Sequence, residues 1–196
     1  MHAAGLVAAR VQGRRARARA RVGFGRMSEG PQALKRSFPP VVDEHTRVLI
    51  LGSLPGEVSL AQSRYYAHPQ NRFWRLLGEV LDTELVALDY AQRLQTLQRH
   101  GIGLWDVVAE ATRIGSLDSR IRDHASNDLV TLVQSLPRLA AIAFNGGTAA
   151  RLGTRALGEH GAAYTLLALP SSSPAYAALP YADKLLQWRA LAAFLA

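Results

Sequence analysis

The segment 48–81 constrains the fold more than any other part of this chain of 196 residues. It opens with Val48–Leu51, an apolar run that is typical of a buried strand. The loop 52–56 follows and contains two glycines and a proline, which end the strand and let the backbone approach a ligand closely. Apolar residues recur at helical spacing from Arg72 to Leu81. The segment therefore predicts a strand, a loop open to a ligand and a helix in succession.

Short apolar runs and helical patterns continue to alternate along the rest of the chain. Strands are predicted at 139–144 and 164–169, a strand or its exit loop at 104–108, and helices at 89–99, 127–136, from 148 onward and 183–195. The expected cap of the helix at 127–136 is Ser126 or Asn127. The apolar residues of the stretch 113–126 follow neither helical nor strand spacing, and we interpret it as a surface connection. Strands that alternate with helices favour an α/β fold with a parallel sheet.

The first 26 residues have a different composition, with seven arginines and no acidic residue. Removing those seven charges from the formal net charge of +8 leaves about +1 for the remainder. A basic arm for DNA, a solvated tail, a targeting peptide and translated sequence upstream of a start at Met27 all remain open. We divide the chain into an Arg-rich extension, 1–36, expected to be disordered, and one domain, 37–196. No function is inferred from the extension.

Composition excludes several kinds of chemistry. The chain has no cysteine, which removes disulfides, thiolate catalysis and Cys-ligated metal or iron–sulfur sites. The histidines lack metal-binding spacing, and there is no Gly-rich nucleotide signature, so neither metal nor cofactor is expected. No apolar run approaches the ~20 residues that span a bilayer. A cytoplasmic protein without a membrane partner is the default expectation.

Several segments, taken in order, resemble one family of DNA repair enzymes. They are Gly52–Gly56 with Ser59 and Leu60, Tyr65–Trp74, Gly103–Val108, Gly115–Ser119, Phe144–Gly146 and Leu169–Ala175. Together they resemble the hypoxanthine-DNA glycosylases, a divergent branch of the uracil-DNA glycosylase superfamily, over about residues 47–188. The resemblance implies three α/β/α layers around a short, mainly parallel, four-stranded central sheet. It also implies a base-excision repair enzyme that hydrolyses the N-glycosidic bond of a deaminated base, most of all hypoxanthine.

Asn71 is the predicted catalytic residue. The main uracil enzymes carry Asp or Asn just after the glycine of the first motif, where this chain has Ser53. The resemblance implies that Asn71 supplies the missing amide. Its carbonyl can orient a water, and its neutral side chain tolerates the cationic sugar of glycoside cleavage. The alternative is that Asn71 only caps the helix that follows, a position that asparagine favours; both roles can coexist.

Stacking on aromatic rings and hydrogen bonds to the base edge hold a flipped base. Tyr66 and Phe73 are the stacking candidates, whereas Trp74 is expected to be a core residue. Asn145, at a strand end before two glycines, has a donor and an acceptor suited to a purine edge. Its alternative role is that of a turn residue.

Three further residues complete the predicted substrate-binding set. Asp106 can orient a water or a neighbouring side chain, or be an ordinary exposed aspartate at a strand end. Ser53 and Pro55 belong to the loop that follows the first strand.

Ser171, Ser172 and Ser173 offer hydroxyls and backbone amides to DNA phosphates, although most serine–proline loops are only turns. The main uracil families begin this second motif with a histidine that stabilises the leaving base. Here Leu169 occupies that position, which argues against uracil chemistry of that type.

Lysine usage separates two mechanisms. Glycosylases that also nick DNA typically use an amine to form a Schiff base with the sugar. Only Lys35 and Lys184 are lysine, and neither lies in a motif loop. We therefore expect a monofunctional, metal-free enzyme that uses water as its nucleophile.

The expected partner is DNA containing a deaminated base, and the expected state is a monomer. A glycosylase preferring uracil or xanthine, a catalytically silent nucleic-acid-binding relative, and a hydrolase of a small nucleoside or phosphoester are the alternatives.

Overall fold

The computed structural model describes residues 34–195. Met27 and most of the predicted Arg-rich extension therefore lie outside the described residues. The last three positions of that extension, Leu34–Arg36, form strand β1, which pairs antiparallel with β4 (Val108–Thr112). The fold thus includes residues that the sequence assigns to the extension.

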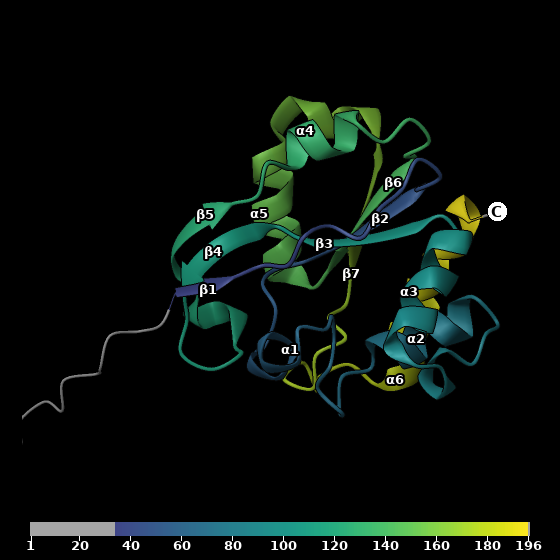
Figure 1. Cartoon of the computed structure of the whole chain (residues 1–196), viewed down its shortest axis with the longest axis horizontal. Helices are drawn as coiled ribbons and strands as arrows, with labels where there is room; N and C mark the ends of the chain where they lie inside the picture. The colour runs from purple at the N-terminus through teal and green to yellow at the C-terminus, as the bar shows by residue number, and fades with distance from the viewer. Residues whose placement is uncertain (1–33, 196) are drawn as a thin grey trace, which may run out of the picture. The chain divides into compact units, whose positions relative to one another are not determined.

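Four parallel strands form the central sheet (Figure 1). They are β2 (Val48–Gly52), β3 (Ile102–Asp106), β6 (Ala141–Asn145) and β7 (Thr165–Leu169). Their order in the sheet is β3-β2-β6-β7, so β2 lies between two parallel neighbours. All five residues of β2 are buried, which explains why its sequence is a continuous apolar run. The predicted parallel, four-stranded sheet is confirmed.

Helices cover both faces of this sheet (Figure 1). The first face carries α2 (Phe73–Val80), α3 (Tyr90–Arg99) and α6 (Tyr181–Trp188), and the second carries α4 (Leu129–Gln134) and α5 (Gly147–Leu157). Residues of β2 alternate between the two cores: Val48 and Ile50 join the first, and Leu49 and Leu51 join the second. The three-layer arrangement is therefore confirmed.

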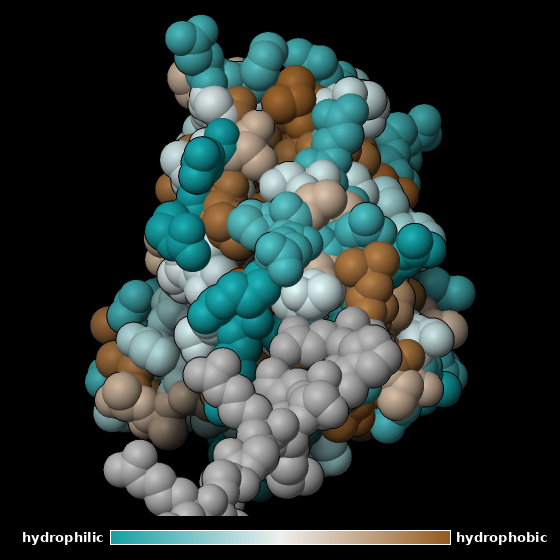
Figure 2. All heavy atoms as spheres, turned by 90° about the vertical axis from the view of Figure 1, so that its left-hand side faces the viewer, coloured by the Kyte–Doolittle hydropathy of each residue, from teal (hydrophilic) through white to brown (hydrophobic). Residues whose placement is uncertain are grey.

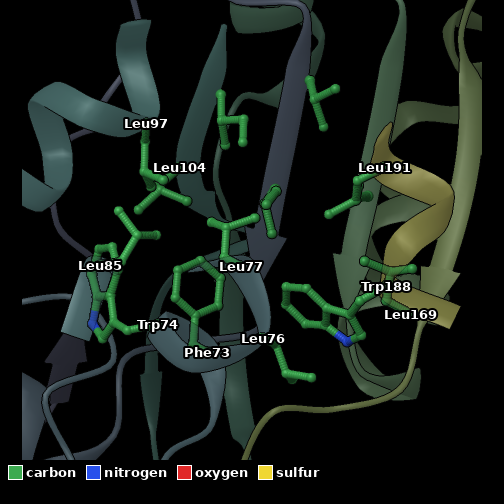
Figure 3. Packing of buried hydrophobic residues seen from close by; sticks show 14 of the residues in the cluster. Phe73, Trp74, Leu76, Leu77, Leu85, Leu97, Leu104, Leu169, Trp188 and Leu191 are labelled. Atoms are coloured by element: carbon green, nitrogen blue, oxygen red, sulfur yellow. The ribbon is translucent and has the colours of Figure 1, made fainter. Parts of the chain in front are cut away.

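The first core is built around the aromatic residues of α2. Figure 3 shows Phe73 between Trp74 and Trp188. Both neighbours meet Phe73 edge to face, with ring centroids 5.1 and 5.7 Å away. Phe73 and Trp188 are completely buried, and Trp74 is almost so. The expectation that Trp74 is a core residue is confirmed, and Phe73 shares that role.

Helix boundaries follow local capping signals, with one correction. Asp89 and Gln92 form the capping box that starts α3, as the predicted boundary at 89 requires. The helix predicted at 127–136 is shorter, and its cap is Asp128, whose side chain accepts from the Thr131 amide. Asp128 therefore takes the place expected for Ser126 or Asn127. The last helix continues beyond α6 as a 3₁₀ helix, η4 (Arg189–Phe194).

The prediction that 113–126 is a surface connection is wrong in part. This stretch contains the 3₁₀ helix η2 (Asp118–Arg120) and strand β5 (Arg122–Ser126), which pairs antiparallel with β4. Strands β1, β4 and β5 form a second, three-stranded sheet. Every residue of β5 is exposed. Backbone pairing alone defines this strand, so no apolar alternation marks it in the sequence.

The remaining elements are short. They are α1 (Glu57–Gln62), which was not predicted, and the 3₁₀ helices η1 (Leu85–Ala87) and η3 (Gly158–Ala163). Figure 2 views the molecule from the side of β1, β4 and β5, where the visible hydrophobic side chains are scattered among hydrophilic ones. Across residues 34–195 no helix has the length and apolarity needed to cross a membrane.

Candidate functional site

The candidate site lies where the parallel strands end. The chain passes from β2 to β3 on one side of β2 and later places β6 on the other side. Such a reversal of strand order opens a crevice at the carboxyl ends of the strands, where α/β proteins bind ligands. Gly52 ends β2 and Asn145 ends β6, so these two residues flank the crevice.

Arg113 anchors the loop 52–56, called the glycine loop below. Its guanidinium donates to the carbonyl oxygens of Leu54 and Pro55, at 3.1 Å for Leu54, and through Nε to Gly115 at 3.0 Å. The Arg113 side chain is fully buried. Burial lowers the pKa of Arg113, because a charged group is costly in a dry environment.

Asp118 provides the counter-charge and a second anchor for the same loop. Its Oδ1 lies 3.7 Å from Arg113 Nη1 and accepts a 2.6 Å hydrogen bond from Ser53 Oγ. Burial raises the pKa of Asp118, while the hydrogen bond from Ser53 and the charge of Arg113 lower it. Ser53 is buried, and its hydroxyl serves this contact. Ser53 and Pro55 therefore shape the site through fixed backbone, and their contact with substrate stays a prediction.

Asp106 is a buried carboxylate with an unused oxygen. It ends β3 beside Gly52, and a Cβ atom at Gly52 would lie 2.6 Å from Asp106 Oδ1. Only glycine at position 52 leaves room for this carboxylate. Asp106 Oδ2 is buried and has no hydrogen-bond partner within residues 34–195. Burial raises the pKa of Asp106 to about 7, although Tyr65 and Arg113 act in the opposite direction. The alternative of an exposed strand-end aspartate is wrong.

Tyr66 and Phe73 form one stack, with ring centroids 3.7 Å apart and planes inclined by 13°. Phe73 has no exposed surface, so it cannot present a free face to a base in this conformation. Phe73 therefore packs beneath Tyr66 and supports its ring. The prediction that Phe73 itself stacks on the flipped base does not fit this packing. Tyr66 is partly exposed. Its backbone has φ of 53°, a left-handed conformation that a tyrosine adopts at a cost of ~1 kcal/mol.

Asn71 lies two residues before Phe73, the first residue of α2, and Arg72 between them is the N-cap. Its Oδ1 accepts a 2.9 Å hydrogen bond from the Phe73 amide. This is the geometry of a side chain that satisfies an open amide at the start of a helix. Its Nδ2 makes no hydrogen bond to any residue of 34–195. Asn71 thus satisfies the first amide of α2 from the position before the N-cap, and a second lone pair on Oδ1 remains for another donor.

Asn145 holds the loop Pro170–Ser173, called the serine loop below. Its Nδ2 donates to Ser172 Oγ at 2.9 Å, and its Oδ1 accepts from the Ser172 amide at 2.8 Å. The Ser172 carbonyl accepts from the Arg72 amide at 3.0 Å, which ties the loop to the start of α2. Asn145 therefore positions the serine loop, and its side chain also lies against the Tyr66 hydroxyl, where burial raises the pKa of Tyr66 while the hydrogen bond with Asn145 lowers it.

The three serines differ in their availability. Ser172 is completely buried, so its hydroxyl is closed to a phosphate in this structure. Ser171 and Ser173 are partly exposed. Lys184 Nζ donates to the carbonyl oxygens of Ser171 and Tyr176 at 3.0 and 2.6 Å, and Trp188 Nε1 donates to Pro170 at 3.0 Å. The loop is thus held mainly through its own backbone.

Known proteins resemble this chain in sequence and fold. The sequence profile of the uracil DNA glycosylase superfamily matches residues 39–193, a span that contains every residue of the site described above. The chain belongs to the uracil DNA glycosylase superfamily.

Two curated relatives place this superfamily member in the hypoxanthine DNA glycosylase branch. A Methanosarcina barkeri (strain Fusaro / DSM 804) protein named hypoxanthine DNA glycosylase is 47% identical over 112 residues, covering 57% of this chain and 71% of the relative. A Methanosarcina acetivorans protein of the same name is 43% identical over 147 residues, covering 72% of this chain and 88% of the relative.

A solved structure agrees with the fold. The solution NMR structure of a candidate uracil DNA glycosylase from Methanosarcina acetivorans superposes with a TM-score of 0.73 at 40% identity. The match covers 82% of this chain and 97% of that chain.

Two residues that hold the glycine loop in place were missed from the sequence, Arg113 and Asp118. Asp118 lies in the segment 115–119, which resembles the family, and that resemblance was the one available signal. Arg113 carried none, because its burial depends on a fold that local periodicity does not show. Within residues 34–195 no group of three or more His, Cys, Asp or Glu side chains is placed to hold a metal ion.

Proposed function

We propose that this protein is a monofunctional DNA glycosylase that removes deaminated bases, with hypoxanthine as the preferred base. One observation carries the proposal: the segments that resemble the hypoxanthine branch come together at the crevice between β2 and β6. The two relatives named hypoxanthine DNA glycosylase support the choice of base.

The reaction is hydrolysis of the bond between the sugar and the base. Water adds to C1′ as the bond from C1′ to the base nitrogen breaks. The electron pair of that bond and a proton pass to the base, which leaves a hydroxyl on an abasic sugar. We assign the orientation of the water to Asn71, whose side chain is held by the Phe73 amide. A fixed amide costs no reorganisation when charge develops on the sugar.

The base is assigned to the side of Tyr66 that faces away from Phe73. Phe73 packs against one face of the Tyr66 ring and holds the ring in a fixed orientation. Asp106 Oδ2 lacks a partner within residues 34–195. An N–H at the edge of the base would donate to it, and a base oxygen would accept from it when Asp106 is protonated. The Asn145 amide, beside the Tyr66 hydroxyl, adds a second contact to that edge. The proposal thus gives each predicted residue a specific contact: Tyr66 with the face of the base, and Asp106 and Asn145 with its edge.

The choice of hypoxanthine over uracil rests on Leu169. This residue ends β7 and is a buried member of the first core. No histidine is therefore present at that position to stabilise a departing uracil anion. Release of hypoxanthine is expected to be faster than release of uracil or xanthine.

A water nucleophile is favoured by the position of the lysines. Lys184 Nζ is bound to two carbonyl oxygens of the segment 171–176, and Lys35 Nζ is bound to Glu57 and the Gly115 carbonyl. Neither amine is presented to the crevice. DNA is the proposed partner, and a cytoplasmic monomer is the proposed state.

The test is a panel of otherwise identical duplexes that carry hypoxanthine, xanthine or uracil. Each is treated with alkali after reaction, so that abasic sites are converted into strand breaks. Hypoxanthine should be released fastest, and breaks should appear only after alkali. Reduction with borohydride during the reaction should trap no protein–DNA adduct. Equal or faster release of uracil would contradict the assignment.

A second candidate function is a catalytically silent DNA-binding relative. It is favoured by the hydrogen bond between Asn71 and the Phe73 amide, since a helix cap alone explains that contact. Duplex binding without release of any of the three bases would support it.

A further inference from the structure

A cavity lies beside the candidate site. It has a volume of about 510 Å³ and is enclosed by the segment 64–75, by η1 and by the start of α3. Tyr66 and Asn71 belong to its wall, whereas Asp106, Asn145 and the serine loop do not. The cavity is thus adjacent to the crevice between β2 and β6 but separate from it.

Its walls carry a marked excess of positive charge. Four arginines line it, Arg64, Arg72, Arg75 and Arg93, against one carboxylate, Asp89. Asp89 Oδ1 is already bound to the Gln92 amide at the start of α3. Positive charge in a concave site with low-dielectric walls concentrates the electric field and attracts anions.

Two of the four arginines use guanidinium N–H groups in contacts within the protein. Arg75 Nε pairs with Glu79 at 3.2 Å. Arg93 donates to the carbonyl oxygens of Leu88 and Val86 at 3.0 and 2.8 Å. These contacts hold the wall of the cavity in place.

The other two arginines, Arg64 and Arg72, have unused guanidinium donors within residues 34–195. Arg64 lies over the Tyr90 ring, with its guanidinium carbon 5.6 Å from the ring centroid. Stacking fixes the plane of a guanidinium and leaves the N–H groups on its edge free for a bidentate contact with a phosphate. The geometry therefore suits a phosphodiester better than a compact cation or an apolar ligand.

We propose that this arginine-lined cavity binds the backbone phosphates of the damaged strand next to the excised nucleotide, with Arg64 and Arg72 as the contacts. The proposal rests on the proposed function, since it takes DNA as the ligand. Asn71 and Tyr66 lie in the shared wall, so a strand held in the cavity leads directly to the groups assigned to water and base. The phosphates would thereby fix which nucleotide enters the crevice.

The test measures binding of the full chain to a duplex that carries a non-cleavable deoxyinosine analogue, over a range of salt concentrations. Arg64→Ala should weaken binding roughly tenfold at moderate salt. It should also reduce the slope of log K against log salt by about 0.9, the value for one lost phosphate contact. Arg64→Lys keeps the charge and should keep the slope.

Arg138→Ala is the matched control. Arg138 is exposed and precedes β6, at the opposite edge of the sheet, and its loss changes the net charge by the same amount. Its salt slope should equal that of the unmodified protein. An equal loss of slope in Arg138→Ala and Arg64→Ala would overturn the cavity as a specific site.

A neutral methylphosphonate, moved one position at a time along the damaged strand, locates the contact. At one or two positions beside the lesion it should weaken binding of the unmodified protein but not that of Arg64→Ala. If Arg64→Ala is sensitive at every position where the unmodified protein is, the inference is wrong even though base release stands. If no base is released from any duplex, the proposed function fails, while the salt slopes still decide whether the cavity binds phosphate.

Discussion

The glycine loop and the serine loop meet at the same edge of the sheet, but different forces hold them. The glycine loop is fixed by charge, through the buried guanidinium of Arg113 and the carboxylate of Asp118. The serine loop is fixed mainly by neutral hydrogen bonds, from Asn145, the Arg72 amide and Trp188, together with one lysine. The anchors of the glycine loop come from the stretch around the second sheet, and those of the serine loop come from the central sheet, α2 and α6.

The two loops also differ in how many of their polar atoms have hydrogen-bond partners. The polar atoms of the serine loop are largely paired with one another or with Asn145. On the side of the glycine loop, Asp106 Oδ2 has no partner within residues 34–195. Asn71, before α2, has an amide nitrogen that makes no hydrogen bond in the same range. We infer that chemistry takes place on the side of the glycine loop and that the serine loop closes the site from the other side.

The largest effect is expected from Asp106→Asn, which tests the unpaired carboxylate beside Gly52. The pKa of Asp106 is about 7 in the folded protein against an ordinary 3.8, so the folded state binds more protons between these values. Stability should therefore fall as the pH rises from about 4 to 7, by about 4 kcal/mol in total from this group. Asp106→Asn removes this titration and should flatten the curve. The measurement is the urea midpoint at several pH values, and equal pH slopes in the two proteins would contradict the prediction.

Arg113→Met tests the charged anchor of the glycine loop. The change leaves two backbone carbonyls without their donor and leaves Asp118 without its counter-charge. The free energy of unfolding should fall by about 3 kcal/mol, as when one partner of a buried pair is removed. Denaturant unfolding with an unchanged m-value would measure this loss. A loss below about 1 kcal/mol would show that water replaces the guanidinium, in the range of exposed pairs.

Asn71→Ala tests the residue that lies between the two loops. If its amide positions water, single-turnover cleavage should slow by at least ~10²-fold. Loss of the contact with the Phe73 amide should cost only ~1 kcal/mol of stability. Asn71→Ser keeps a capping oxygen but is too short to hold water in the same place, and Asn71→Asp keeps the length and adds charge. Cleavage at a near-native rate in Asn71→Ser would make Asn71 a helix cap and nothing more.

The smallest effect is expected from Lys184→Met, which tests the one charged anchor of the serine loop. Lys184 Nζ binds two carbonyl oxygens, and nearby positions 174–178 are exposed, so water can take its place. The loss of stability should be about 1 kcal/mol, with Lys184→Arg as the control that keeps the charge. Thermal or urea midpoints would measure it beside Arg113→Met. A loss as large as that of Arg113→Met would erase the distinction between the two loops.

The sequence alone predicted the central sheet and the end of it at which the candidate site lies. Val48–Leu51 is apolar because β2 is buried between parallel neighbours, and such a run is visible without any tertiary information. The helix at 72–81 and the capped start of α3 are also local patterns, and both are confirmed. Because parallel strands end at one edge of a sheet, the motif residues that follow them could be placed together in advance.

The assignment of roles within the site depended on tertiary contacts. Phe73 and Tyr66 are both aromatic residues of one motif, and only packing against Trp188 makes Phe73 the buried support. Asn145 and Ser172 are 27 residues apart, and their two hydrogen bonds exist because β6 and β7 lie side by side. The predicted contacts of these residues with DNA stay predictions.

Local sequence thus determined which segments are strands and helices and which residues follow them, because burial of one strand or one helix face leaves a periodic trace. The tertiary structure alone decided that Arg113 is buried, that Asp106 keeps a raised pKa and an unused oxygen, and that four arginines share one cavity. Desolvation and charge pairing arise between segments far apart in the chain. They depend on the distance between groups in space, which periodicity does not encode.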